Sequence, residues 1–172
     1  MSASFGIRPV RKDEYAIAGD IVARAYAAAA RDAGVAFEEQ EYDGLRDVAA
    51  RVSHSLVLVS TSGARVVGSV TYVGDESSPL AEFDGGDTAG IRMLAVDPEL
   101  QKQGIAQALV TECVARALSE GKKRIVLHTL EWMTGARRLY ESFGFLRTPE
   151  LDLEFPGLHL MAFVKRTGNG TK

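Results

Sequence analysis

One stretch decides the fold of this chain, residues 94–106, which read LAVDPELQKQGIA. The stretch begins as an apolar strand, turns at Asp97-Pro98, and enters a helix just after Gly104. The first turn of a helix has backbone N–H groups without partners and carries a partial positive charge. Gly104 lets a ligand approach the backbone, and Ala106 keeps the next contact small. The stretch therefore predicts a strand–turn–helix unit that can hold a phosphate or pyrophosphate.

Two common nucleotide motifs are absent at this turn. The chain has no Gly-x-x-x-x-Gly-Lys-Ser/Thr sequence, which excludes a P-loop. It has no Gly-x-Gly-x-x-Gly between a strand and a helix, so a Rossmann dinucleotide site is not supported. A single glycine at a helix start is by itself a weak signal, and an ordinary turn is the simpler interpretation.

The spacing of apolar residues predicts the elements on either side. We expect strands at 5–10, 55–60, 65–73, 89–96, 124–129, 145–148 and 158–165, helices at 12–32, 41–53, 102–118 and 134–143, and a loop at 74–87. The strand–helix–strand order in the middle implies parallel pairing, and the flanking hairpins imply antiparallel pairing. The pattern predicts an α/β fold, a mixed sheet with helices on both faces.

Length and composition limit the function classes. The 172 residues suit one domain, which we place at 1–166, with a disordered tail at 167–172. A net charge of −3 argues against a non-specific nucleic-acid binder. The single cysteine, Cys113, excludes an internal disulfide and a zinc site of paired cysteines, and no metal-ligand spacing is seen. Without a signal-like start or a membrane span, we expect a cytoplasmic protein with no membrane partner.

A second motif lies downstream at residues 136–145, which read ARRLYESFGF. Together with Gln101-x-x-Gly104-x-Ala106, it resembles the two signatures of the GNAT superfamily of N-acetyltransferases. The motifs occur in the family's order with one helix and one strand between them, and the resemblance covers nearly the whole chain. It implies a GNAT-like fold: a twisted, mostly antiparallel sheet of six to seven strands, with helices on both faces and a splayed parallel pair at the centre.

The resemblance also implies acetyl-CoA as cosubstrate, without a metal. The strand at 94–96 would pair with the pantetheine arm, and the amides at 102–107 would hold the pyrophosphate, with Gln101 opening the loop. The expected cofactor-binding residues are thus Leu94, Ala95, Val96, Gln101, Lys102, Gln103, Gly104, Ile105, Ala106 and Gln107.

Tyr140 is the expected catalytic residue. Acyl transfer from a thioester to an amine expels a thiolate, and a nearby hydroxyl can protonate it. A phenol with a pKa of about 10 is protonated at neutral pH. The implied activity is direct transfer of the acetyl group to a primary amine in a ternary complex. The alternative is a tyrosine that only packs on an amphipathic helix.

The chain departs from the family pattern in two places. Met133 stands where many members have an asparagine that contacts the pantetheine arm. The central strand carries Gly90 and Arg92, with no acid to serve as general base. Other acids could act through water, although each is more simply a solvated loop residue: Glu82, Asp84 and Asp87, or Glu38, Glu39 and Glu41. His128 lies in an apolar strand and is expected to be a satisfied core residue.

The acceptor is not specified by these motifs. It could be an amine-bearing small molecule, a protein or a peptide, entering over the first two helices and the loop at 74–87. Two rivals stay open, a transferase for a longer acyl-CoA and a non-catalytic CoA-binding sensor or interaction domain. A homodimer is also left open.

Overall fold

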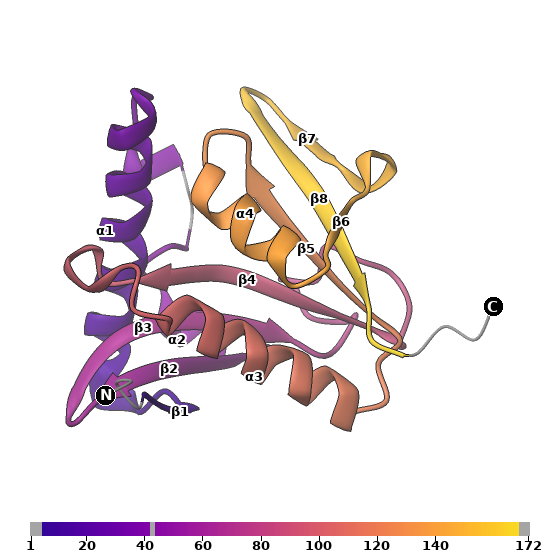
Figure 1. Ribbon diagram of the computed structural model, residues 1–172, viewed down its shortest axis with the longest axis horizontal. Coiled ribbons are helices and arrows are strands. Elements are labelled where there is room, and N and C mark those ends of the chain that lie inside the picture. Colours follow the sequence, from indigo (N-terminus) through magenta and orange to yellow (C-terminus); the bar gives the residue numbers. More distant parts are fainter. Residues whose placement is uncertain (1–4, 42–43, 169–172) are drawn as a thin grey trace.

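The structure is a computed structural model that describes residues 5–41 and 44–168. One twisted sheet runs through it in the order β1-β2-β3-β4-β5-β8-β6, and β7 also pairs with β8 (Figure 1). The strands are β1 Gly6–Pro9, β2 Leu56–Ser62, β3 Arg65–Val73, β4 Thr88–Val96, β5 Arg124–Leu130, β6 Leu146–Arg147, β7 Leu153–Phe155 and β8 Leu158–Arg166. The α-helices are α1 Tyr15–Ala33, α2 Val48–Val52, α3 Ile105–Ser119 and α4 Thr134–Ser142. Short 3-10 turns are η1 Lys12–Glu14, η2 Glu39–Glu41, η3 Pro98–Leu100 and η4 Pro149–Leu151.

The predicted mixed α/β fold with one parallel pair is confirmed. Strands β4 and β5 run parallel, and the other pairings in the sheet are antiparallel. The sheet has eight strands where six to seven were expected. The extra strand, β7, has three residues, too few to show a period-2 pattern. It pairs with the start of β8 and β6 pairs with its end, so the two lie along the same side of β8 with η4 between them.

Helices cover both faces of the sheet. On one face α1 and α2 pack on Val57 and Val59 of β2, and on the other α3 packs beside Leu58. Successive side chains of a strand point to opposite faces, so β2 contributes to both layers of core. Figure 1 shows α3 and α4 on the same side of the sheet, away from α1.

The first two helices differ in how well the sequence predicts them. Helix α1 ends at Gly34, whose φ of 68° forms a left-handed cap, as the pattern suggests. The helix expected at 41–53 is shorter and begins only at Val48. Gly44 has a φ of 82°, and the Asp47 side chain accepts a hydrogen bond from the Ala50 amide. These two features start the helix late.

The parallel strands separate half-way along their length. Strand β4 pairs with β5 from Thr88 to Ile91, whereas β5 stays paired with β8 as far as Leu130. Beyond Ile91, β4 follows β3 alone, and its register shifts by a bulge around Met93. This divergence opens the sheet between the carboxyl-terminal halves of β4 and β5.

Hydrogen bonds fix the end of the chain as far as Thr167. Its amide donates to the Lys123 carbonyl at 3.0 Å, and its hydroxyl bonds the Lys122 carbonyl. Residues 169–172 of the expected tail lie outside the described residues. Within the described part of the chain, no helix has both the length and the hydropathy needed to cross a bilayer.

Candidate active site

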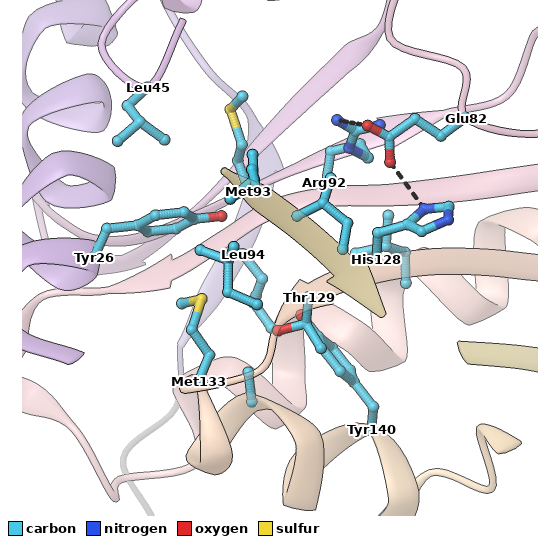
Figure 2. A pocket seen from close by; sticks show the side chains of 15 residues that line it. Tyr26, Leu45, Glu82, Arg92, Met93, Leu94, His128, Thr129, Met133 and Tyr140 are labelled. Carbon is cyan, nitrogen blue, oxygen red and sulfur yellow. Dashed lines mark ion pairs between the residues drawn. The ribbon is translucent and has the colours of Figure 1, made fainter. Parts of the chain in front are cut away.

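A cavity of about 190 Å³ lies where β4 and β5 diverge (Figure 2). Its walls come from α1, the segment before α2, the loop before β4, both diverging strands, α4 and the start of β8. The lining residues are Tyr26, Leu45, Glu82, Ile91, Arg92, Met93, Leu94, His128, Thr129, Leu130, Met133, Ala136, Tyr140, Leu158 and Leu160. Two of the sequence-predicted site residues, Tyr140 and Leu94, meet here.

Tyr140 enters the cavity from α4. The residue is 6% exposed, and its ring packs edge-on against Phe145 with centroids 5.9 Å apart. The hydroxyl points into the pocket, toward the ends of β4 and β5 (Figure 2). Burial, with smaller contributions from Tyr26 and Cys113, raises the pKa of Tyr140 above its ordinary value. The phenol is therefore a proton donor across the neutral range.

The bulge in β4 changes the direction of the backbone beside this hydroxyl. Met93 has a φ of 51°, a conformation that few residues other than glycine adopt. Because Ala95 lies opposite Ser69 and Arg92 lies opposite Thr71, two residues of β4 face one of β3. Met93 and Leu94 therefore fall outside the paired register of β3 and β4, and both residues line the cavity.

The other expected cofactor-binding residues, at 95–96 and 101–107, do not line the cavity. Ala95 and Val96 are buried in the sheet at 4% and 8% exposure. The segment 101–107 follows η3 and forms the start of α3, and none of its side chains lines the cavity. Ile105 is 1% exposed and packs in the core, so only its amide is available to a ligand.

The start of α3 has the geometry of an anion cradle. Gly104 is its N-cap with a φ of 84°, and Lys102 has a φ of 64°. A Cβ atom at Gly104 would meet nothing within 4 Å, so the approach to the backbone is open. The first helical hydrogen bond runs from the Ala108 amide to the Gly104 carbonyl, which leaves the preceding amides without helical partners.

Close packing and an ion cluster hold this turn in place. A Cβ atom on Gly68 of β3 would lie 2.9 Å from Ile105 Cγ2, so this glycine lets α3 sit directly on the sheet. Asp97, 2% exposed, accepts hydrogen bonds from Arg65 at 2.8 Å and Arg24 at 3.3 Å. Burial disfavours the Asp97 carboxylate, but the Arg24 hydrogen bond and the other partners outweigh it and lower its pKa.

Glu82 lies in the cavity wall. From the sequence, a solvated position in the loop was the simpler expectation for this residue. Its side chain is 17% exposed, with Oε1 2.5 Å from Arg92 Nη2 and Oε2 2.8 Å from His128 Nδ1. The expectation that Glu82 is a solvated loop acid is wrong. His128 has the expected buried side chain, 2% exposed, but it faces Glu82 and the cavity rather than apolar core alone. Figure 2 shows the three side chains together on one wall.

The loop at 74–87 delivers Glu82 because both of its ends are tied down. Lys122 Nζ donates to the Gly74 carbonyl at 2.6 Å and to the Gly86 carbonyl at 2.8 Å. Between them, Arg92 Nη1 donates to the Leu80 carbonyl at 3.0 Å. The ring of Phe83, the residue after Glu82, packs against Gly90 of β4.

The other candidate acids do not line the cavity. Asp84 and Asp87 are exposed, and Asp87 lies 3.6 Å from Lys123. Glu39 pairs with Arg46, Glu38 is exposed, and the side chain of Glu41 lies outside the described part of the chain. Among the described residues, no group of three or more His, Cys, Asp or Glu side chains could hold a metal ion.

Several lining residues carried no functional signal in the sequence. Tyr26 has the spacing of a core position on α1, and Leu45, Leu158 and Leu160 are ordinary apolar residues. They meet only because β8 and the segment before α2 come together at the divergence of β4 and β5. Met133, at the position of the missing asparagine, also lines the cavity.

Comparisons with known proteins agree with this architecture. A family model described as the acetyltransferase (GNAT) family matches residues 21–145. Mycothiol acetyltransferase from Thermobispora bispora is 37% identical over 67 residues, covering 39% of this chain and 23% of that protein. N-acetylaspartate synthetase from Danio rerio is 34% identical over 73 residues, covering 42% of this chain and 26% of that protein. The matches therefore span about a quarter of each curated relative.

Solved structures share the fold over nearly the full chain. A GNAT-family acetyltransferase from Staphylococcus aureus Mu50 superposes with a TM-score of 0.72 at 12% identity, covering 96% of this chain and 100% of that one. yncA from Salmonella typhimurium, solved with its cofactor acetyl-CoA, has a TM-score of 0.67 at 22% identity, with 98% and 96% covered. PaiA N-acetyltransferase from Thermoplasma acidophilum, solved with coenzyme A, has a TM-score of 0.71 at 15% identity, with 95% and 99% covered. With the family model matching from the middle of α1 to the residue before β6, this chain belongs to the acetyltransferase (GNAT) family.

Proposed function

We propose that this protein is an N-acetyltransferase that transfers the acetyl group of acetyl-CoA directly to a primary amine. The observation that carries the proposal is the position of Tyr140: its hydroxyl points into the cavity where β4 leaves β5, beside the bulged backbone at Leu94. Family membership supports the same reaction class.

The residues at the end of β4 and the start of α3 fit coenzyme A. The open approach at Gly104 and the amides from Lys102 to Gln107 suit a pyrophosphate. Strand β4, unpaired on the β5 side beyond Ile91, offers backbone groups to an extended pantetheine arm. Gln101 opens the loop and Lys102 adds a positive charge. The path from Leu94 through Val96 to Gly104 would thus follow the length of the cosubstrate.

The residues of the chain would then perform three tasks. Acetyl-CoA supplies an activated acetyl thioester, and amides near Leu94 and Ala95 would stabilise the charge that develops on the acetyl oxygen. Tyr140 would donate its proton to the departing sulfur, which its raised pKa permits at neutral pH. The acceptor amine would approach from the α1 side of the cavity.

We propose a small amine with an apolar body as the acceptor. Beyond the charged wall, the lining is apolar and aromatic and includes Tyr26, Leu45, Met93, Leu158 and Leu160. Such a surface favours a carbon skeleton over a polycation. A protein or peptide amine is the alternative acceptor, entering by the same opening.

Thermal melts with several ligands test the proposal. Acetyl-CoA at about 100 times its dissociation constant adds about 2.7 kcal/mol to the free energy of unfolding, a rise of several degrees in Tm. The melt is repeated with a longer acyl-CoA, and thiol release is then measured with apolar amines, polyamines and amino acids. Aspartate is included because one partial relative is named for its acetylated product. A larger shift with the longer acyl-CoA would favour that cosubstrate, binding without turnover would favour a sensor, and no shift would overturn the cofactor site.

A further inference from the structure

The tautomer of His128 follows from its contacts. Its Nε2 lies 2.8 Å from the Leu151 carbonyl oxygen of η4. A carbonyl oxygen only accepts hydrogen bonds, so Nε2 carries a hydrogen. The other ring nitrogen, Nδ1, lies 2.8 Å from Glu82 Oε2. Nδ1 is therefore the ring atom that gains or loses a proton.

A proton on Nδ1 would turn this contact into an ion pair. Without it, the lone pair of the imidazole would face a carboxylate oxygen at 2.8 Å with both side chains largely buried. The contact has the distance of an ion pair without the angles of a hydrogen bond, and neither atom has another hydrogen-bond partner in the described chain. With that proton, the attraction between an imidazolium and a carboxylate would compensate the burial of both atoms.

We propose that Glu82 and His128 act as one proton-accepting unit, which removes a proton from the ammonium form of the acceptor. This inference rests on the proposed acetyltransfer. In the deprotonated unit, Glu82 is a carboxylate and His128 is neutral. The acceptor R–NH3+ transfers one proton to this unit, leaving R–NH2 with a free lone pair for attack, and the N–H+ bond electrons stay on nitrogen. The unit then holds the shared proton and returns it to solvent through the open cavity after each turnover.

The charges of the wall fit this sequence of steps. Arg92 pairs with the other oxygen of Glu82 at 2.5 Å, and it is the permanent cation of the cluster. The protonated unit plus Arg92 carries one positive charge and repels an ammonium, whereas the deprotonated unit plus Arg92 is neutral. The remaining titratable side chains in the lining are Tyr26 and Tyr140. The charged acceptor is therefore expected to bind better to the deprotonated unit, which is the form that can take its proton.

The unit is held from three elements. Glu82 comes from the loop that Lys122 ties at both ends, His128 from β5, and the carbonyl that orients the ring from η4. A purely structural role, in which the two side chains only hold the loop on the sheet, is the competing explanation.

The main test compares pH profiles of kcat/KM for the wild type, Glu82→Gln, His128→Gln and the double variant. Glutamine at 82 keeps an oxygen for Arg92, and glutamine at 128 keeps an amide donor for the Leu151 carbonyl. Both variants are expected to lose about 10²- to 10⁴-fold in rate with a protonated amine and to lose the acidic limb of the profile. The double variant is expected to be no slower than the slower single variant, because the residues act as one unit.

A second amine and a control variant distinguish proton transfer from a structural role. With an amine that is already unprotonated at the assay pH, the variants are expected to approach the wild-type rate. Asp84→Asn, an exposed acid of the same loop, is the matched control and is expected to keep the wild-type profile. Equal losses with both amines, with the acidic limb intact, would overturn the proposal in favour of a structural role. A wild type that turns over no amine would instead overturn the acetyltransfer itself.

A readout without cosubstrate examines this contact directly. In ¹⁵N NMR of the protein alone, His128 Nε2 is expected to carry a hydrogen, because it faces the Leu151 carbonyl. In Glu82→Gln, the Nδ1 resonance is expected to change, because the carboxylate in contact with this atom is gone. An Nδ1 resonance that is the same in the variant and the wild type would overturn the inference whatever the activity.

Discussion

The ring of Phe83 covers Gly90 so closely that a Cβ atom at position 90 would lie 2.9 Å from Phe83 Cε1. Gly90 is on β4 in the stretch that pairs with β5, just before the strands diverge. The contact lets the loop at 74–87 lie directly on the strand and brings the preceding residue, Glu82, to the cavity wall. Gly90 thus leaves room for the Phe83 ring, and this packing positions Glu82 at the cavity.

Gly90→Ala is therefore expected to disturb the site from outside the cavity lining. The new methyl group pushes Phe83 away, and Glu82 moves with it, at a cost of about 1–3 kcal/mol in stability. We expect kcat to fall while the affinity for acetyl-CoA, measured by calorimetry, stays the same. Adding Phe83→Leu should restore part of the rate by relieving the overlap. Wild-type kinetics in Gly90→Ala would show that the loop does not depend on this contact.

Gly104→Ala tests the anion cradle. At a φ of 84°, an alanine costs about 1–2 kcal/mol, and its Cβ occupies the approach to the α3 amides. We expect acetyl-CoA binding to weaken by about tenfold or more, the equivalent of roughly 1.4 kcal/mol. Gly121→Ala is the matched control, because Gly121 has a φ of 71°, equally open space, and a position just beyond the other end of α3. Equal binding in the two variants would contradict the cradle.

Tyr140→Phe separates chemistry from packing. The phenylalanine keeps the ring that packs edge-on against Phe145 and removes only the hydroxyl. We expect kcat to fall by about 10²-fold or more with unchanged acetyl-CoA binding and Tm. Since burial raises the pKa of Tyr140, wild-type activity should show no alkaline loss from this residue up to about pH 10. A Tyr140→Phe enzyme with full activity would leave the tyrosine a packing residue.

Asp97→Asn is expected to loosen the turn before α3 in a pH-dependent manner. The folded-state pKa of Asp97 is below its ordinary value of 3.8, so its stabilisation is present above that value and is lost as pH falls through the folded-state pKa. At pH 7 we expect a loss of about 1–3 kcal/mol from the hydrogen bonds to Arg24 and Arg65. In denaturant melts, the difference in the free energy of unfolding between Asp97→Asn and the wild type should disappear below pH 4. A difference that stays the same at all pH values would contradict a stabilising role of the Asp97 carboxylate.

Much of the fold followed from local patterns. The strand ending at Val96, the turn at Asp97-Pro98 and the helix after Gly104 were all predicted, because apolar period and glycine placement are local properties. The three-residue β7 was missed because a segment that short has no period of its own and is defined by its partner β8.

By itself, the sequence determined the family motifs, the mixed sheet and the presence of a tyrosine on the helix that follows β5, because each depends on residues close together in the chain. Only the tertiary structure decided which acid reaches the cavity. Glu82, Arg92 and His128 come from a loop and two strands, and their meeting depends on the Phe83–Gly90 contact and on Lys122 holding both loop ends. Such long-range packing leaves no periodic trace in the sequence, so a carboxylate that reads as solvated becomes part of the candidate site only when the chain is folded.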